Sequence, residues 1–276
     1  MKISFTKMSG AGNDFVVVDN RNSIISDPHA FAVKVCDRRF GIGADGLLLL
    51  EISSKADFLM KYYNADGTDA GMCGNGGRCI AKYAFDMGIV SKEHFNFEAL
   101  DYIYAAKRID NTVYDLKMKN PFDLIQNQQI VVAGQTIQGN YLNTGTDHCM
   151  VFLDENHNLG TLETTDVFTI GRTVRYHNLY QPKGTNVNFI SKSAPNSIDI
   201  RTYERGVEEE TLACGTGSVA SALLSAIKYE MQSPVKVKVR SGELLEISFQ
   251  RKENSFFDVH LKGNAIMTFT GEIDLV

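Results

Sequence analysis

The chain has 276 residues, of which 43% are hydrophobic and 22% charged, as is typical of a folded globular protein. A formal net charge of -5 without a Lys/Arg cluster excludes the electrostatic footprint of a nucleic-acid-binding protein. No apolar run approaches the ~20 residues of a membrane helix, and the N-terminal MKISFTKMSG lacks the apolar core of a signal peptide. We therefore expect a cytoplasmic protein with one large or two medium-sized domains.

Short alternating apolar runs predict strands along most of the chain, with four helical patterns between them. The predicted strands are Ile3–Thr6, Phe15–Val18, Leu47–Glu51, Phe58–Tyr63, Tyr102–Arg108, Thr112–Met118, Gln128–Val132, Thr136–Leu142, Cys149–Leu153, Asn186–Ile190, Ser197–Tyr203, Val235–Val239, Leu244–Phe249, Phe256–Leu261 and Ala265–Phe269. The predicted helices are Pro28–Arg38, Gly76–Met87, Leu162–Arg172 and Gly217–Tyr229. Asp27 is a plausible N-cap for the first helix, with Pro28 at its first position.

The five cysteines differ in their sequence context. Their odd number, wide spacing and lack of a CxxC pair favour reduced thiols and argue against a structural metal site. Cys36 and Cys79 are expected in the core, whereas Cys149, next to His148, can be either a core or a functional residue. Cys73 and Cys214 stand out because each begins a glycine-rich segment.

A weak internal repeat surrounds these two cysteines. Cys73-Gly-Asn-Gly-Gly-Arg-Cys and Cys214-Gly-Thr-Gly-Ser-Val-Ala each follow a strand and a turn, and each runs into an apolar helix. They lie about half a chain length apart. The repeat predicts an α/β fold of the α+β type with two pseudo-symmetric domains. Each domain is expected to be a curved, mainly antiparallel sheet around one central helix, with the active site in the interdomain cleft.

The residue types in this repeat suit proton transfer. A helix N-terminus carries unpaired N–H groups and a partial positive charge, and it can lower the pKa of a cysteine thiol from about 8.5 toward 7. Glycines allow an anion to approach the backbone closely. Two such helix ends facing one cleft would hold a carboxylate and place one sulfur on either face of the adjacent carbon. This arrangement can invert a stereocentre without an electron-sink cofactor.

Other polar residues allow both a structural and a functional interpretation. His148, in Thr144-Gly-Thr-Asp-His, is either structural or a group that tunes a thiol. Glu204 and Arg205 form either a surface ion pair or a tuning carboxylate and a carboxylate clamp. Three asparagines are either turn formers or head-group ligands: Asn13, Asn64 and Asn186.

The sequence also allows a comparison with three other functions. Gly41-Ile-Gly-Ala-Asp-Gly matches a dinucleotide-binding pattern, but it follows a helix and enters a strand, which is the reverse of the required context. A Cys–His hydrolase or transferase predicts a covalent intermediate and one dispensable cysteine. A non-catalytic amino-acid-binding or redox-sensing protein predicts binding without proton exchange.

The ordered motifs GAGNDF, GIGADGL, YNADGT, MCGNGGRC, GTNVNF and ERGVEEETLACGTGS resemble the diaminopimelate epimerase family over nearly the whole chain. The resemblance implies a pyridoxal-phosphate-independent isomerase, a homodimer without a cofactor, that interconverts LL- and meso-diaminopimelate in lysine and peptidoglycan biosynthesis. Related racemases of other amino acids share the two-cysteine architecture. The resemblance to the family also implies domains at 1–117 plus 262–276 and at 118–261, because the family's last strand returns to the first domain.

The resemblance assigns roles residue by residue. Cys73 and Cys214 are the acid–base pair, and His148 and Glu204 tune them. The backbone N–H groups that hold the reacting carboxylate belong to Gly74, Asn75, Gly215 and Thr216. The distal amino-acid end is read by Asn13, Asn64, Asn186, Glu204 and Arg205. The family's usual Gly-Asn-Pro-His segment reads Gly145-Thr146-Asp147-His148 here, so a substrate contact of that Asn is altered.

Overall fold

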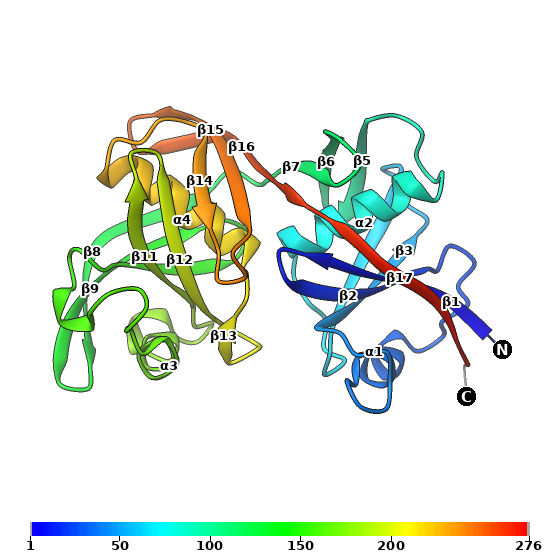
Figure 1. The fold of residues 1–276 in the computed structure, drawn as a ribbon, viewed down its shortest axis with the longest axis horizontal. Coiled ribbons are helices and arrows are strands. Elements are labelled where there is room, and N and C mark those ends of the chain that lie inside the picture. The colour runs from blue at the N-terminus through cyan, green and yellow to red at the C-terminus, as the bar shows by residue number, and fades with distance from the viewer. Residues whose placement is uncertain (1, 275–276) are drawn as a thin grey trace. The chain divides into compact units, whose positions relative to one another are not determined.

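The computed structural model describes residues 2–274, which divide into two compact units (Figure 1). The first unit contains the chain up to Lys117 together with the segment from Lys262 onward, and the second contains Met118–Leu261. Strands predominate in both units, and four α-helices occur among the described residues. The fold is therefore a mixed α/β fold that consists mostly of β-sheet.

The first unit is a mainly antiparallel sheet with two helices. Its strands are β1 (Lys2–Gly10), β2 (Asn13–Asp19), β3 (Gly46–Glu51), β4 (Phe58–Asn64), β5 (His94–Ala99), β6 (Tyr102–Arg108), β7 (Val113–Lys117) and β17 (Ile266–Asp274). Its helices are α1 (Pro28–Cys36) and α2 (Gly74–Asp86). The late strand β17 pairs antiparallel with β1, opposing Lys2 to Asp274, so the end of the chain completes the sheet begun by its start.

The second unit also combines a sheet with two helices. Its strands are β8 (Phe122–Val132), β9 (Gln135–Asn143), β10 (Asp147–Phe152), β11 (Asn186–Ala194), β12 (Ser197–Glu204), β13 (Glu209–Thr211), β14 (Val235–Lys238), β15 (Leu244–Lys252) and β16 (Ser255–Asn264), the last of which runs on into the first unit. Its helices are α3 (Val167–Arg175) and α4 (Gly215–Lys228), and two short 3-10 turns lie at His157–Leu159 and Asn178–Tyr180.

The same order of strand pairings occurs in both units. From β1 to β6 the successive pairs are antiparallel, parallel, antiparallel, parallel and antiparallel. The series β9, β10, β11, β12, β14 and β15 gives the same order. In each series one helix joins the strands of the first parallel pair, and the cysteine-bearing helix joins those of the second. The internal repeat seen around the cysteines is thus also a repeat of topology.

Helices α2 and α4 each lie at the centre of their own unit (Figure 1). Helix α2 packs against β1, β2, β3, β4, β6, β7 and β17, and α4 packs against β10, β11, β12, β14 and β15. Every residue from Gly215 to Ala226 of α4 is buried, as is every residue from Gly74 to Ala84 of α2. The Gly, Ala and Ser residues of α4 suit a helix that packs against several strands.

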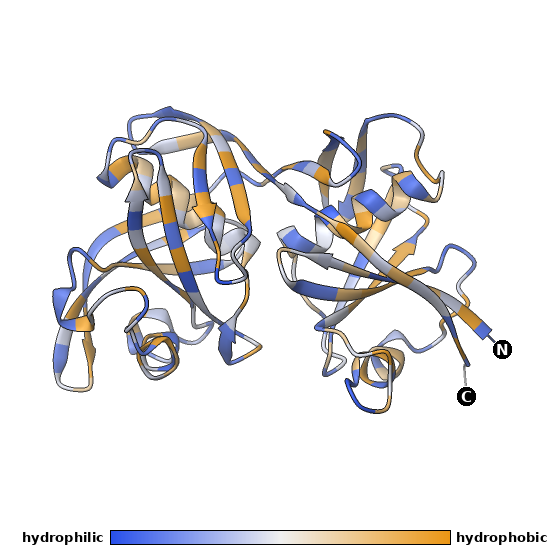
Figure 2. Cartoon of the chain, viewed as in Figure 1, coloured by the Kyte–Doolittle hydropathy of each residue, from blue (hydrophilic) through white to orange (hydrophobic). Residues whose placement is uncertain are grey.

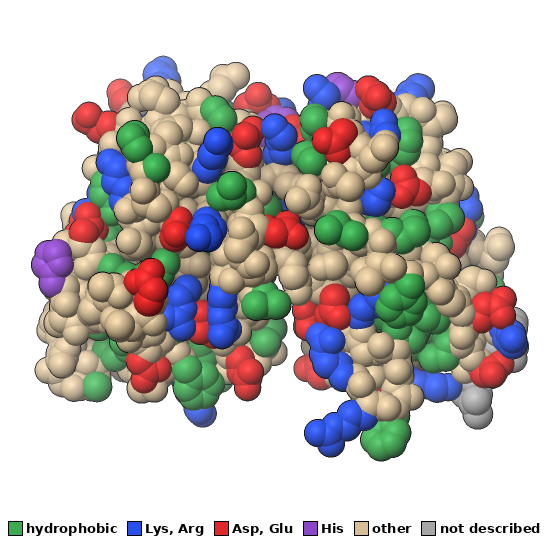
Figure 3. Space-filling model, viewed as in Figure 1, with side chains coloured by type: hydrophobic (Ala, Val, Ile, Leu, Met, Phe, Trp, Pro, Cys, Tyr) green, Lys and Arg blue, Asp and Glu red, His purple; other side chains and the backbone are tan. Residues whose placement is uncertain are grey.

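Hydrophobic and hydrophilic residues alternate along several strands (Figure 2). In β15 the buried residues Leu245, Ile247 and Phe249 alternate with more exposed ones. On the face shown in Figure 3, acidic and basic side chains are interspersed over both units. No helix among residues 2–274 is long and apolar enough to cross a membrane.

The four predicted helices are present, but their ends differ. Helix α1 begins as predicted, since Asp27 accepts from Ala30 N at 3.1 Å and Pro28 is its first residue. It ends at Cys36 rather than Arg38 because the Asp37 carboxylate caps the next turn by accepting from Phe40 N at 2.7 Å. Helix α3 begins at Val167, not Leu162, because Asp166 caps it through Thr169 N at 3.0 Å.

The two central helices begin two residues earlier than predicted. Gly77 N donates to Cys73 O at 2.8 Å, and Ser218 N donates to Cys214 O at 2.9 Å. The first turn therefore starts directly after each cysteine. Glycine weakens helix interiors, which favoured a later start, but the N–H groups of the first turn lack intrahelical acceptors in any case, and glycine is tolerated there.

Two strands were missed. In β5, buried Phe95, Phe97 and Ala99 alternate with polar residues, a signal present in the sequence but not used. The strand β13 has three residues, too few for a periodic pattern. Strand β8 begins six residues earlier than predicted because its first half is largely exposed and pairs with β9 through two register shifts.

Candidate active site

Cys73 is the N-cap residue of α2. Its backbone is extended (φ -103°, ψ 119°), and its sulfur accepts from Gly76 N at 3.5 Å. The thiol also donates to Asn13 Oδ1, with Sγ and Oδ1 3.5 Å apart. The side chain is half-buried. Cys73 thus lies where a first-turn amide and a polar side chain both contact its sulfur.

Asp45 contacts both segments that carry the predicted asparagines of this unit. Asn13, at the start of β2, donates from Nδ2 to Asp45 Oδ2 at 2.6 Å. Asn64, at the end of β4, donates from Nδ2 to Thr68 Oγ1 at 3.0 Å, and the next residue, Ala65, donates its N–H to Asp45 O at 3.2 Å. The structure therefore brings Asn13 close to Cys73 and connects Asn64 to the same loop.

A buried arginine lies beneath the first turn of α2. Arg78 is fully buried and donates to Gly74 O at 3.1 Å and to Asn75 Oδ1 at 2.9 Å. The Asn75 side-chain oxygen is thereby engaged by a residue one turn further along the same helix. A buried guanidinium adds positive charge to that of the helix N-terminus, which favours an anion there. Sequence reasoning missed Arg78, although an Arg within a Gly-rich apolar helix is a signal in itself.

Cys214 is the N-cap residue of α4 and is 6% exposed. Its backbone is also extended (φ -120°, ψ 112°). Its sulfur lies 3.6 Å from the hydroxyl of Thr216, and its carbonyl accepts from Ser218 Oγ at 2.8 Å. Gly215 and Thr216 are the first two residues of α4, where backbone N–H groups lack intrahelical acceptors.

His148 is fully buried in β10 and reaches Cys214 through Thr216. Its Nε2 lies 3.0 Å from Thr216 Oγ1 and 2.9 Å from Thr146 Oγ1, and its Nδ1 lies 3.2 Å from Asn188 Nδ2. With the Asn188 amide donating to Nδ1, the ring proton is assigned to Nε2, which donates to a threonine hydroxyl. That hydroxyl is then free to donate to the Cys214 sulfur.

Burial lowers the pKa of His148 to about 3, and the positive charge of Arg205 acts in the same direction. The charge of Asp147 opposes this shift without cancelling it. The imidazole is therefore neutral at physiological pH, so it can orient Thr216 but does not place a positive charge beside the thiol.

Glu204, Arg205 and Asn186 lie at the end of β12 and the start of β11. The Glu204 carboxylate accepts from Thr211 Oγ1 at 2.8 Å. Asn186 Oδ1 accepts from Arg205 N at 2.9 Å, and Asn186 Nδ2 donates to Asp147 O at 3.0 Å. The Asn186 side chain thus links the backbone at Arg205 to the backbone at Asp147.

Asp147 is a further residue of this network. Its carboxylate accepts from Arg205 Nη1 at 2.9 Å and from Tyr141 OH at 2.6 Å. Burial acts to raise its pKa, but these hydrogen bonds lower it overall, so Asp147 is ionised. One guanidinium nitrogen of the predicted carboxylate clamp is therefore occupied by an acidic side chain of the same unit. The departure from the family's Gly-Asn-Pro-His segment marked position 147 as unusual, but it did not indicate that Asp147 pairs with Arg205.

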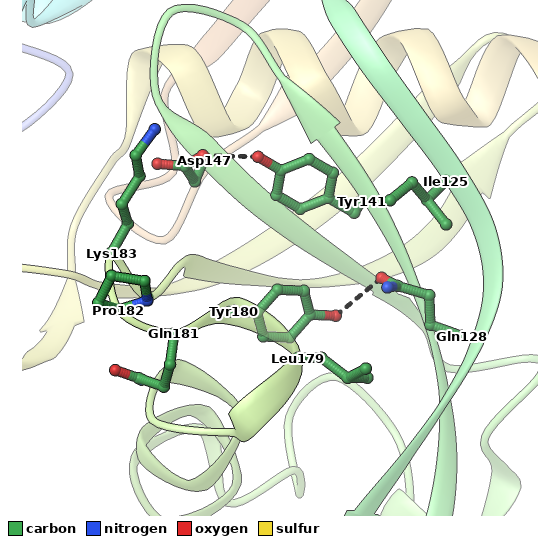
Figure 4. Close-up of a pocket in the computed structure, with 10 residues that line it drawn as sticks. Ile125, Gln128, Tyr141, Asp147, Leu179, Tyr180, Gln181, Pro182 and Lys183 are labelled. Atoms are coloured by element: carbon green, nitrogen blue, oxygen red, sulfur yellow. Dashed lines mark hydrogen bonds between the residues drawn. The ribbon is translucent and has the colours of Figure 1, made fainter.

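A pocket of about 240 Å³ borders this network in the second unit (Figure 4). Asp147 and Tyr141 lie at one side of it, and Tyr180, whose hydroxyl donates to Gln128 Oε1 at 3.0 Å, lies at the other. Lys183 lies beside Asp147. None of the predicted site residues lines this pocket.

The remaining cysteines are core residues. Cys36 and Cys79 are buried, which confirms their prediction, and Cys149, left open by the sequence, is fully buried against the Tyr180 hydroxyl at 3.2 Å. Burial raises the pKa of both Cys36 and Cys149 to about 12, so neither forms a thiolate at neutral pH. Within residues 2–274, no group of three or more His, Cys, Asp or Glu residues is placed to hold a metal ion.

Comparisons with known proteins agree with this architecture. A family model described as diaminopimelate epimerase matches residues 5–103 and 140–267. The chain is similar to proteins named diaminopimelate epimerase from Chlorobaculum tepidum (43% identity, 97% of this chain and 100% of the relative), Flavobacterium psychrophilum (41%, 95% and 97%) and Aquifex aeolicus (37%, 98% of both).

Solved structures with low sequence identity share the fold. A probable proline racemase from Agrobacterium radiobacter matches with a TM-score of 0.77 at 15% identity, over 99% of this chain and 93% of that one. A PhzF-family protein from Bacillus anthracis matches with a TM-score of 0.75 at 13% identity, over the full length of both chains.

Proposed function

The chain belongs to the diaminopimelate epimerase family, and from this premise we propose that it interconverts LL- and meso-diaminopimelate by a two-base proton transfer. As a family member it is an isomerase of lysine biosynthesis. One thiolate removes the proton from the substrate α-carbon, and the opposite thiol delivers a proton to the other face. The observation that carries the proposal is that a cysteine is the N-cap residue of the central helix in each unit.

In the proposed scheme the helix N-termini also stabilise the negative charge that develops on the substrate. The α-proton of an amino acid is very weakly acidic, and its removal places negative charge on the adjacent carboxylate. Backbone N–H groups of Gly74, Asn75, Gly215 and Thr216 are proposed to hold that carboxylate and stabilise the charge. The thiols carry the proton and the amides stabilise the charge, so the scheme uses no cofactor. It needs reduced cysteines, which a cytoplasmic location would maintain.

Substrate recognition is proposed to lie in the residues around Asp45 and Asp147. Asn13, Asn64, Asn186, Glu204 and Arg205 would bind the distal amino-acid group. Arg205 keeps further N–H donors besides the one that bonds to Asp147, and a guanidinium can bind a carboxylate through two of them. A racemase of another amino acid remains the alternative, because Thr146 and Asp147 replace the family's usual pair.

The buried imidazole does not favour the hydrolase alternative. A nucleophilic cysteine needs a base that takes its proton near neutral pH. With a pKa of about 3, His148 is a poor proton acceptor at that pH. Its nitrogens are also occupied by Thr146, Thr216 and Asn188.

Exchange of the α-proton in heavy water, followed by NMR, tests the proposal. Wild type, Cys73→Ala and Cys214→Ala would be incubated with LL-diaminopimelate and a panel of other amino acids. We expect wild type to exchange and epimerise diaminopimelate, and each variant to lose about 10²–10⁴-fold in the rate of epimerisation. Cys36→Ala, which removes a core thiol of α1, is the control and should keep exchange.

The other outcomes are equally informative. Exchange with a different amino acid alone would keep the mechanism and reassign the substrate. Full epimerisation by either single variant would contradict the two-base scheme. No exchange with any substrate would favour a binding or redox-sensing protein.

A further inference from the structure

The Gly41-Ile-Gly-Ala-Asp-Gly segment has a structural role close to Cys73. Its acidic residue, Asp45, lies directly before β3. One carboxylate oxygen of Asp45 accepts from Asn13 Nδ2 at 2.6 Å and from Asp14 N at 3.1 Å. The other accepts from Arg38 Nη2 at 2.7 Å. Asp45 therefore contacts Asn13, whose side-chain oxygen accepts from the Cys73 thiol.

The charged surroundings keep this carboxylate in place. Asp45 N donates to Asp14 Oδ1 at 3.0 Å, and Arg38 also donates to Asp14, at 2.8 Å. Lys7, which is largely buried, pairs with Asp14 at 2.7 Å. Burial acts to raise the pKa of Asp14, but hydrogen bonds from Arg38 and Lys7 lower it overall. The loop before β3 is thus tied to β1 and β2 by two cations and two carboxylates.

We propose that Asp45 is a positioning residue that fixes the orientation of the Asn13 side-chain amide and, through it, favours the thiol form of Cys73. An ionised carboxylate accepts hydrogen bonds and donates none, so the Asn13 amide must present its NH₂ group to Asp45. The Asn13 carbonyl oxygen then points toward Cys73, where it accepts from the S–H. A thiolate at that position would meet a carbonyl oxygen instead of a donor.

The contacts of the Cys73 sulfur with Gly76 and Asn13 therefore favour opposite protonation states. The Gly76 N–H donates to the sulfur and favours the thiolate, whereas the Asn13 oxygen favours the thiol. Cys214, by contrast, lies beside the Thr216 hydroxyl, which can donate to its sulfur. This inference rests on the proposed function only in naming Cys73 as one of the acid–base pair. The resting enzyme would accordingly hold its proton on Cys73 more readily than on Cys214.

Alkylation of the resting enzyme measures this directly, because the thiolate is the reactive form. Wild type and Asp45→Asn would be treated with iodoacetamide at pH 7 without substrate, and labelling of Cys73 and Cys214 would be quantified by peptide mass spectrometry. An Asn at position 45 can donate as well as accept, so the Asn13 amide is no longer held in one orientation. We expect the ratio of Cys73 to Cys214 labelling to rise about fivefold.

Arg38→Ala is the matched comparison. It removes the ion pair between Arg38 and Asp45, and also that between Arg38 and Asp14, but leaves the Asp45 carboxylate facing Asn13. The proposal predicts a labelling ratio close to wild type for Arg38→Ala. Asp19→Asn, which breaks the Asp19–Arg21 pair elsewhere in the same unit, controls for the loss of one negative charge.

Several outcomes would overturn the proposal. They are an unchanged ratio in Asp45→Asn, an equal rise at both cysteines, or the same change in Arg38→Ala as in Asp45→Asn. If Asp45→Asn does not fold, Asn13→Ala removes the acceptor itself and must raise the same ratio. Because no substrate is present, a chain without epimerase activity would still give a decisive result, so the two proposals fail separately.

Discussion

The first turns of α2 and α4 share one sequence pattern but lie in different surroundings. In both, an extended cysteine caps the helix and a Gly-x-Gly follows. The surroundings of Cys73 are charged: Asn13 connects its sulfur to Asp45 and Arg38, whose side chains are 43% and 59% exposed. Those of Cys214 are buried and mostly neutral: Thr216, His148 and Asn188 lie in the interior.

This difference shows how one motif can give two unlike thiols. The helix N-terminus offers the same amides and the same partial charge in both units. The protonation of each sulfur is then set by the neighbouring side chains, which come from other strands. Two thiols with opposite preferences suit a reaction that needs one base and one acid at the same time.

The largest expected difference between the two helices concerns their equivalent glycines, Gly76 and Gly217. A Cβ on Gly217 would lie 2.4 Å from Asn188 Oδ1, and this side chain is held by Thr202 and His148. A Cβ on Gly76 would meet only side-chain carbons, at 3.3 Å or more. We expect Gly217→Ala to lower the free energy of unfolding by about 1–3 kcal/mol, and Gly76→Ala to change it by less than about 1 kcal/mol.

Urea unfolding of the two variants measures this difference. Equal losses of stability would show that Asn188 moves aside at little cost, and the comparison between the helices would then be wrong at this position.

A second difference concerns the pH dependence of stability. The first turn of α4 contacts a buried imidazole, that of His148, through Thr216. The pKa of His148 is about 3 in the folded chain and 6.5 in the unfolded one, so the unfolded state binds the proton first as pH falls. The stability contributed by the neutral ring is complete above pH 6.5 and is lost toward pH 3, by up to about 1.4 kcal/mol per pH unit. His148→Gln keeps polar contacts but cannot titrate.

We therefore expect the unfolding free energy of wild type to fall more steeply than that of His148→Gln between pH 6.5 and 4.5. Denaturant titrations at several pH values, with both proteins in parallel, measure the two slopes. Parallel slopes would mean that protons reach His148 in the folded state.

The smallest expected effect is on substrate binding, and it concerns the residues around Asp147 rather than those around Asp45. Asp147 holds one nitrogen of Arg205, so Asp147→Asn should loosen the guanidinium without touching either thiol. We expect KM for diaminopimelate to rise about threefold to tenfold with kcat nearly unchanged, since this pair is only partly shielded from solvent. Steady-state kinetics beside Asp199→Asn, which affects the exposed Lys238 pair, test this. A fall in kcat with constant KM would place Asp147 in the chemical step instead.

Much of the architecture was predictable because it depends on local patterns. Alternation located most of the strands, and the Asp27–Pro28 signal located the start of α1. The repeated Cys-Gly-x-Gly motif placed both cysteines at helix N-termini. Helix ends were less predictable because side-chain caps such as Asp37 and Asp166 decide them. The strand β5 was missed although its alternation was visible.

The site was predictable only in part because its contacts join distant segments. Thr146, Asn188 and Asp45 carry no signal that marks them as parts of the hydrogen-bond networks that lead to Cys214 and Cys73. Asn188 lies on β11 and His148 on β10, and the parallel pairing of these strands is what brings the two side chains within 3.2 Å. The sequence shows that Arg78 is an unusual residue for a Gly-rich helix, but it does not show that Arg78 is buried.

By itself, the sequence determined the family, the isomerase activity, the strand-rich α/β fold and the two cysteine-capped helices, because these follow from short motifs and local periodicity. Only the tertiary structure decided that His148 is neutral, that Asp147 occupies part of Arg205 and that Asp45 orients Asn13. Burial and hydrogen-bond partners depend on which strands pair and what covers them, and residues far apart in the chain make those choices together.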